Sequence, residues 1–271
     1  MSNKLIDERL KSLIKSYIED FIEKQNNPEL KNVIVENSIP VIWFGDIDKY
    51  LKSKLRVITV ALNPSVKEFY NSKTNTVENR FEIVDFQQGV TDDSINSLKE
   101  TLCQYFKTNA LKPYSLWFSW PEYALNCLGA TYYDLPKHRI NEADCYNTAV
   151  HIDVYSAIAT DPTWSKLEYD IQNKLKNTDL FSELVKYLDP DIIMVSVSDI
   201  ANIISLFPDC NFVFVGEKFE YRGKYKEKVY LRRYVSDNKN LLWMSPWKSS
   251  AFGQRHEFTQ QSIKELMKGL R

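Results

Sequence analysis

The sequence predicts an α/β fold: a central, mainly parallel β-sheet flanked by helices. A β-branched apolar run at residues 56–62 is typical of a buried parallel strand. Strand-like and helix-like segments alternate beyond it, as they do in βαβ units. With 271 residues, 44% of them hydrophobic, the chain can also bury the large core that such a sheet needs.

The chain begins with a predicted helical extension. Apolar residues recur at helical spacing between Leu5 and Ile22 with charges between them, which predicts an amphipathic helix ending near Asn26-Asn27-Pro28. Its polar face mixes acids and bases, so we expect it to cap the core rather than to bind a membrane. We assign residues 1–40 to this extension and residues 41–271 to the α/β domain.

The remaining elements are predicted from hydrophobic periodicity and from the turn residues between the periodic segments. The predicted strands are 57–62, 149–155, 191–197, 211–215 and 240–244, and the predicted helices are 179–187, 198–207 and 257–270. Asp161 and Pro162 are typical of a helix cap and a first helical position.

A hairpin is predicted at residues 217–233, with seven basic residues and three acidic ones. It is either a solvated edge that lysines protect from aggregation or an arm that contacts phosphates.

Composition excludes several classes of protein. No apolar run approaches the ~20 residues that cross a bilayer, and no signal peptide is evident, so we expect a cytoplasmic protein with no membrane contact. The four cysteines form no C-x-x-C pair, and no glycine-rich phosphate loop is present, so we expect neither a metal nor a cofactor. A net charge of −1 requires any nucleic-acid contact to come from a local basic surface.

Polar residues collect where two predicted strands end. Asn63-Pro64-Ser65 closes the first strand, and Ser245-Pro246-Trp247 closes the last. Since ligands bind at the carboxyl ends of strands in open α/β sheets, both loops are expected to line one cleft.

These loops resemble those of the uracil-DNA glycosylase superfamily. The segment from Ser245 to His256 is similar to the family's His-Pro-Ser-Pro-Leu-Ser loop with its following Gly-Phe-x-Gly-x-Arg-His. Leu62-Asn63-Pro64 resembles the first motif of the mismatch-specific branch, and the strand 151–155 ends where the family places its base-reading Asn. The resemblance covers roughly residues 41–271 and implies the family's fold and a DNA partner.

The resemblance implies a monofunctional DNA glycosylase, which hydrolyses the N-glycosidic bond of a flipped base. Asn63 would orient the water but is no strong base, so the enzyme would be slow or selective. The alternative for Asn63 is a plain turn. Trp243 stands at the family's catalytic His, which leaves His151, His256 or Arg255 to stabilise the leaving base.

Asp153 departs from the family's base-reading Asn. A carboxylate only accepts hydrogen bonds, which suits the amino group of cytosine. The alternative is a buried structural carboxylate paired with His151 or a lysine. Ser65 replaces a Tyr that blocks 5-substituents in the uracil-specific branch, although turns also favour a small residue. Phe81 is the candidate ring that stacks on the flipped base.

We therefore expect a glycosylase for 5-modified cytosine, similar to those that defend bacteria against phage, with uracil or a mismatch as the next substrates. Trp247 would intercalate into the duplex, unless it is a core residue. The remaining DNA contacts are expected from Ser245, Lys248, Ser249, Arg255 and His256. We expect a monomer, and the alternative function is a non-catalytic nucleic-acid-binding protein.

Overall fold

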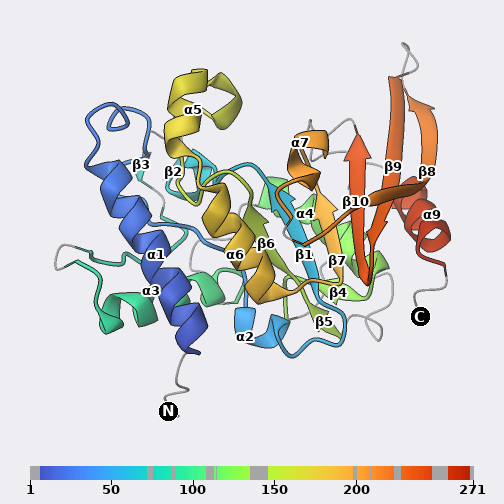
Figure 1. Ribbon diagram of the computed structural model, residues 1–271, viewed down its shortest axis with the longest axis horizontal. Coiled ribbons are helices and arrows are strands. Elements are labelled where there is room, and N and C mark those ends of the chain that lie inside the picture. Colours follow the sequence, from blue (N-terminus) through green and yellow to red (C-terminus); the bar gives the residue numbers. More distant parts are fainter. Residues whose placement is uncertain are drawn as a thin grey trace. The chain divides into compact units, whose positions relative to one another are not determined.

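The computed structural model (Figure 1) describes residues 7–71, 76–77, 79–86, 89–107, 113, 115–134, 146–197, 200–207, 209–222, 227–245 and 256–268. Contacts divide the chain into two compact units. The helical unit comprises Met1–Phe44, Leu62–Pro113 and Asp153–Tyr187, and the sheet unit comprises Gly45–Ala61, Tyr114–Ile152 and Leu188–Arg271. The division at residue 40 that the sequence favours stays a prediction.

A six-stranded sheet forms the centre of the sheet unit, in the order β6-β1-β7-β10-β9-β8. Its strands are β1 (Val57–Ala61), β6 (Val150–Asp153), β7 (Ile192–Val195), β8 (Val213–Arg222), β9 (Glu227–Ser236) and β10 (Lys239–Ser245). The strand β7 pairs in parallel with β1 on one side and with β10 on the other. All four residues of β7 are apolar and buried, as a central parallel strand requires. The predicted α/β class with a mainly parallel sheet is confirmed.

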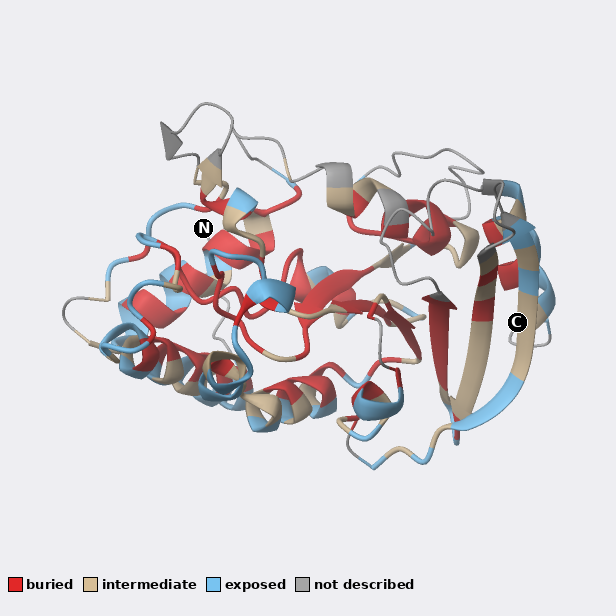
Figure 2. Cartoon of the chain, turned by 90° about the horizontal axis from the view of Figure 1, so that it is seen from above, coloured by how far each residue is buried: buried red, intermediate tan, exposed pale blue. Residues whose placement is uncertain are grey.

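The strands β8 and β9 form an antiparallel hairpin at one edge of this sheet. It confirms the predicted hairpin and extends the strand predicted at 211–215, while residues 223–226 lie outside the described part of the chain. One face of the hairpin is covered by α9 (His256–Leu266): Arg233 Nη1 donates to the Leu266 carbonyl at 2.5 Å, and Lys218 pairs with Glu265. Figure 2 shows the hairpin as mainly intermediate or exposed, in contrast to the buried central strands.

The helical unit contains α1 (Glu8–Gln25), α3 (Asp92–Gln104), α5 (Tyr169–Leu175) and most of α6 (Thr178–Leu188). The Asp7 carboxylate caps α1 by accepting from the backbone N–H of Arg9 at 3.0 Å. The apolar residues of α1, Leu10 to Phe21, form its buried face. The predicted amphipathic helix is confirmed.

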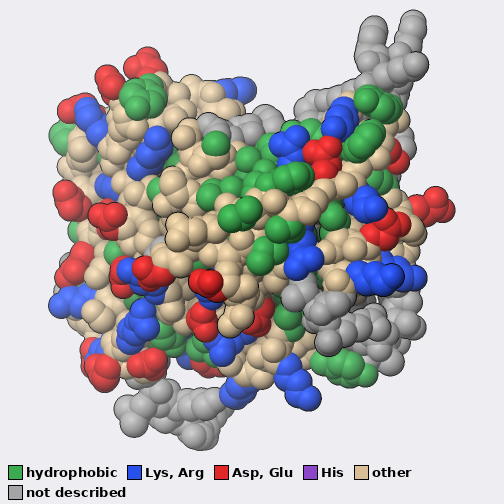
Figure 3. Space-filling view, turned by 45° about the vertical axis from the view of Figure 1, so that its right-hand side comes forward, with side chains coloured by type: hydrophobic (Ala, Val, Ile, Leu, Met, Phe, Trp, Pro, Cys, Tyr) green, Lys and Arg blue, Asp and Glu red, His purple; other side chains and the backbone are tan. Residues whose placement is uncertain are grey.

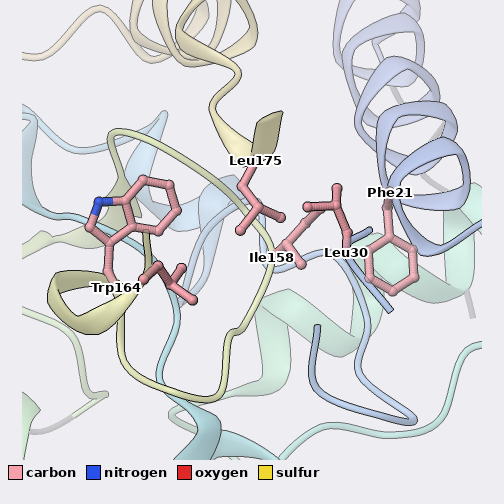
Figure 4. Close-up of a cluster of buried hydrophobic side chains, with 6 residues drawn as sticks. Phe21, Leu30, Ile158, Trp164 and Leu175 are labelled. Carbon is pink, nitrogen blue, oxygen red and sulfur yellow. The ribbon is translucent and has the colours of Figure 1, made fainter. Parts of the chain in front are cut away.

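A cluster of buried side chains forms the core of the helical unit (Figure 4): Phe21, Leu30, Ile158, Trp164, Leu167 and Leu175. Tyr155 packs against this cluster and stacks on Trp164, with ring centroids 5.5 Å apart. Because Ile158 is fully buried here, the core fixes the loop that follows β6.

The structure describes nine further elements. They are α2 (Ile47–Tyr50), the 3₁₀ helix η1 (Val66–Glu68), β2 (Tyr70–Asn71), β3 (Thr76–Val77), α4 (Ser115–Cys127), β4 (Ala130–Thr131), β5 (Asn147–Thr148), the 3₁₀ helix η3 (Trp164–Lys166) and α7 (Ile200–Ile204). The helix predicted at 198–207 is therefore shorter than expected. Among the residues described, no helix has the length and apolar character that crossing a membrane requires.

Candidate functional site

Asn63 lies two residues after β1, in the helical unit, and its side chain is held in one orientation. Its Nδ2 donates to the Ile158 carbonyl at 3.2 Å and to Thr160 Oγ1 at 3.0 Å. A carbonyl can only accept, so the amide nitrogen must face Ile158. The Oδ1 atom of the same planar group receives no hydrogen bond from the residues that the structure describes. It can therefore accept one from a water molecule.

The chain after β1 is hydrogen-bonded to the chain after β6. The Tyr155 N–H donates to the Leu62 carbonyl at 3.0 Å, and Ser65 forms a β-bridge with Thr160. These bonds bring Asn63 and Asp153 to the ends of the neighbouring strands β1 and β6. Asp153 is the last residue of β6 and is 7% exposed.

Ser65 has a structural task at this turn. Its Oγ accepts from the backbone N–H of Lys67 at 3.2 Å and caps the 3₁₀ helix η1. Small hydroxyl residues commonly make such a hydrogen bond in turns. Contact between Ser65 and a 5-substituent stays a prediction.

Glu68, five residues after Asn63, is a buried acid that the sequence analysis missed. It is 2% exposed, Tyr105 Oη donates to its Oε2 at 2.5 Å, and Arg80 Nε lies 3.8 Å from the same oxygen. Burial raises the pKa of Glu68 to about 7, against the opposing effects of the Tyr105 hydrogen bond and the Arg80 charge; the negative charge of Asp153 adds to the rise. A carboxyl group whose pKa lies near neutral pH is suited to transfer a proton, as general acids and bases are.

No pattern in the sequence marks Glu68 as buried. It follows Lys67, which is exposed, and it ends a 3₁₀ helix of three residues that is too short to show periodicity. Its partners Arg80 and Tyr105 follow it by 12 and 37 positions, beyond the reach of so short an element.

Phe81 belongs to a buried aromatic group of the helical unit. Its ring centroid lies 4.9 Å from that of Tyr105, 5.7 Å from Phe69 and 5.8 Å from Phe44. The ring is 5% exposed. Phe81 thus helps to position Tyr105, the donor to Glu68, and its stacking on a base stays a prediction.

His151 lies in the sheet unit and is 3% exposed. Its Nδ1 is 2.8 Å from Thr59 Oγ1, which also hydrogen-bonds to the Tyr132 hydroxyl. The Trp117 ring packs on the imidazole with centroids 4.5 Å apart. The described contacts of His151 are thus with aromatic rings and a hydroxyl group. A contact between His151 and a leaving base stays a prediction.

The second predicted loop lies largely outside the described residues. Trp247, Lys248, Ser249 and Arg255 belong to that part of the chain. The side chains of Ser245, at the end of β10, and His256, at the start of α9, are not described either.

Trp243, which the motif resemblance would align with a catalytic His, is described and buried, with 5% exposure. Its Nε1 donates to the Val197 carbonyl at 2.8 Å. An indole has no second polar group. This side chain therefore stabilises the sheet unit and cannot exchange a proton with a substrate.

The described residues include no group of three or more His, Cys, Asp or Glu side chains that could hold a metal ion. No family model, curated protein or solved structure matches this chain. The resemblance to uracil-DNA glycosylases thus stays a hypothesis based on its motifs.

Proposed function

We propose that the protein is a DNA glycosylase that hydrolyses the N-glycosidic bond of a flipped, 5-modified cytosine. The observation that carries the proposal is the anchored carboxamide of Asn63. Two hydrogen bonds fix its nitrogen, and its oxygen can accept from a water at the end of the central strand β1. A hydrolase with a weak base depends on such fixed positioning of water.

The reaction needs a water behind C1′ and a base that leaves with the bonding electrons. The water oxygen would form a bond to C1′ as the bond from C1′ to N1 breaks, and the water would lose a proton. A cytosine already protonated at N3 would leave as a neutral base. Glu68, whose pKa is raised by burial to about 7, is a carboxyl of this unit that could take up that proton at neutral pH.

The choice of cytosine rests on Asp153. A buried carboxylate accepts from the cytosine amino group, and a cytosine protonated at N3 would donate a second hydrogen bond to it. Ser65 is small enough to leave room for a 5-substituent. Phage genomes that carry such bases would be the natural target.

Trp243 favours a second candidate, a non-catalytic nucleic-acid-binding protein. The indole is tied to Val197 and cannot replace a His that stabilises a leaving base. Such a protein would bind DNA but release no base.

The first test is a panel of DNA duplexes that carry uracil, a thymine mismatch, cytosine, hydroxymethylcytosine or glucosylated hydroxymethylcytosine. After incubation with the protein, alkali cleaves any abasic site. Cleavage of one cytosine derivative alone would support the proposal, and cleavage of uracil alone would reassign the substrate. Binding without cleavage of any duplex would favour the second candidate.

Asn63→Ala should reduce base release by about 100-fold or more, because the positioned water loses its acceptor. DNA affinity should change little, since Asn63 is not proposed to bind phosphate. The matched control is Asn173→Ala, an exposed Asn on α5 of the same unit. If Asn63→Ala released the base at the control's rate, Asn63 would not be the water-positioning residue.

A further inference from the structure

The face of the β8–β9 hairpin that lies opposite α9 carries aromatic and basic side chains. Residues alternate between the two faces of a strand, so Phe219 and Tyr221 lie on the face opposite Lys218, which pairs with Glu265 of α9. Across the ladder, Phe219 is opposite Tyr230, and Tyr221 is opposite Lys228. We call Phe219, Tyr221, Lys228, Tyr230 and Arg232 the aromatic face.

The outer rings of the aromatic face are open to solvent. Phe219 is 52% exposed and Tyr221 is 62% exposed. Figure 3 shows hydrophobic side chains beside lysines and arginines in the right half of its view. Exposed aromatic groups bordered by charge are typical of binding surfaces.

Cations are held against these rings. Lys228 Nζ lies 4.3 Å from the Phe219 centroid, and the Arg232 guanidinium carbon lies 4.2 Å from the Tyr230 centroid. Glu217 fixes both cations, because its two oxygens accept from Lys228 and Arg232 at 2.6 Å each. The result is a sheet surface on which rings alternate with positioned cations.

The positive charge of the hairpin indicates which class of partner the aromatic face binds. Residues 217–233 carry seven bases and three acids, whereas the whole chain has a net charge of −1. Two copies of this hairpin would repel each other, but a polyanion would be attracted. Exposed rings also stack on unpaired bases, which a duplex hides. We propose that the aromatic face binds single-stranded nucleic acid, with bases stacked on Phe219 and Tyr221 and phosphates near Lys228 and Arg232.

This surface would hold a strand whether or not the protein excises a base. The probe is therefore a labelled oligothymidine of about 16 nucleotides, near the upper site size of a single-stranded binding module. It contains no proposed substrate base, so failure of the glycosylase proposal would not alter the result. Fluorescence anisotropy at low salt gives the Kd.

The test variant is Phe219→Ala/Tyr221→Ala, and the matched control is Tyr146→Ala/Tyr169→Ala, which removes two exposed rings elsewhere. The test variant should bind about tenfold or more weakly, because each stacked ring contributes appreciably to affinity. The control should bind like the unaltered protein. Circular dichroism of both variants checks that the fold is kept.

Two results would overturn the proposal. One is an unchanged Kd for the test variant. If sedimentation then also showed that the two substitutions dissociate a dimer, the aromatic face would be a self-association surface. The other is that the protein binds a duplex of the same length as tightly as the single strand and that the test variant loses the same affinity for both. Unpaired bases would then have no role in binding.

Discussion

Glu68 is a buried carboxyl group that the fold holds in its protonated form over part of the pH range. Burial and the nearby charge of Asp153 favour the neutral acid, while Tyr105 and Arg80 favour the carboxylate. Burial has the largest effect, so the folded protein keeps this proton after the unfolded chain has lost it. The free energy of unfolding must then depend on pH.

Stability should fall as the pH rises from about 4.5 to about 7, because the folded state binds more protons than the unfolded state in this window. A shift of this size corresponds to roughly 3 kcal/mol at about 1.36 kcal/mol per pKa unit. Glu68→Gln keeps an acceptor for Tyr105 but does not titrate, so it should remove this contribution. Urea unfolding at about pH 5 and about pH 8 gives the free energy of unfolding of both proteins.

Equal pH dependence in the two proteins would show that Glu68 does not titrate in this window. The control is Glu183→Gln, an exposed residue on α6, which should follow the unaltered protein.

Asp153→Asn should shift base preference from cytosine derivatives towards uracil. An amide both donates and accepts, so it can pair with O4 and N3–H of uracil, while the carboxylate cannot donate. The rates of base release from uracil and 5-modified cytosine duplexes measure this shift. We expect the ratio of the two rates to change by about tenfold or more, because one or two hydrogen bonds to the base are gained or lost. If the base preference of the variant were unchanged, Asp153 would be a structural carboxylate.

The helix α1 is attached to its unit by Lys24 as well as by its apolar face. Lys24 Nζ donates to Asp20 Oδ2 at 3.0 Å and to the Leu175 carbonyl at 2.8 Å, and Asn177 Nδ2 donates to Asp20 Oδ1 at 2.7 Å. This polar group links α1 to the end of α5 and the start of α6. Lys24 is buried, with 9% exposure.

Lys24→Ala should lower the free energy of unfolding by about 2 to 3 kcal/mol, because Asp20 and the Leu175 carbonyl lose a buried donor. The same helix provides the control: Lys15 pairs with Glu19 at 3.8 Å, and both side chains are more than half exposed. Lys15→Ala should cost less than about 0.5 kcal/mol. Similar losses in the two variants would mean that the buried contacts of Lys24 contribute little.

Residues 160–163 show how tertiary hydrogen bonds override a local helix signal. The sequence predicts a helix that starts at Asp161 and Pro162, but the 3₁₀ helix η3 begins at Trp164. Thr160 forms bridges with Ile34 and Ser65, and the Asp161 N–H donates to the Val33 carbonyl. These bonds keep the segment extended, so the helix begins two residues later than the sequence predicts.

Across the whole molecule, charge is distributed unevenly. The net charge is −1, but residues 217–233 carry seven bases and three acids, so the proposed binding of single strands should depend on this hairpin. Lys228→Gln/Arg232→Gln should reduce the slope of log K against log salt by about 1.4 for single strands, since two phosphate contacts are lost. Lys174→Gln/Lys186→Gln, on α5 and α6, should leave the slope unchanged. An unchanged slope in the hairpin variant would place the phosphates elsewhere.

The sequence alone was sufficient for features that depend on local pattern. The β-branched runs identify β1 and β7 because a strand buried on both faces needs continuous apolar residues. The 3.6-residue period of α1 gives its buried face. The Asn-Pro pair marks the end of β1 just before Asn63, and the apolar run that contains β6 places Asp153 at the end of a strand.

Only the tertiary structure decided what surrounds these residues. The partners of Asn63 lie more than 90 positions away, and the Tyr105 hydroxyl that donates to buried Glu68 lies 37 positions away. Trp243 is buried, and its indole donates to the Val197 carbonyl, 46 positions away. Burial, pKa and side-chain orientation depend on contacts between distant segments, and no pattern within a short window of sequence contains them.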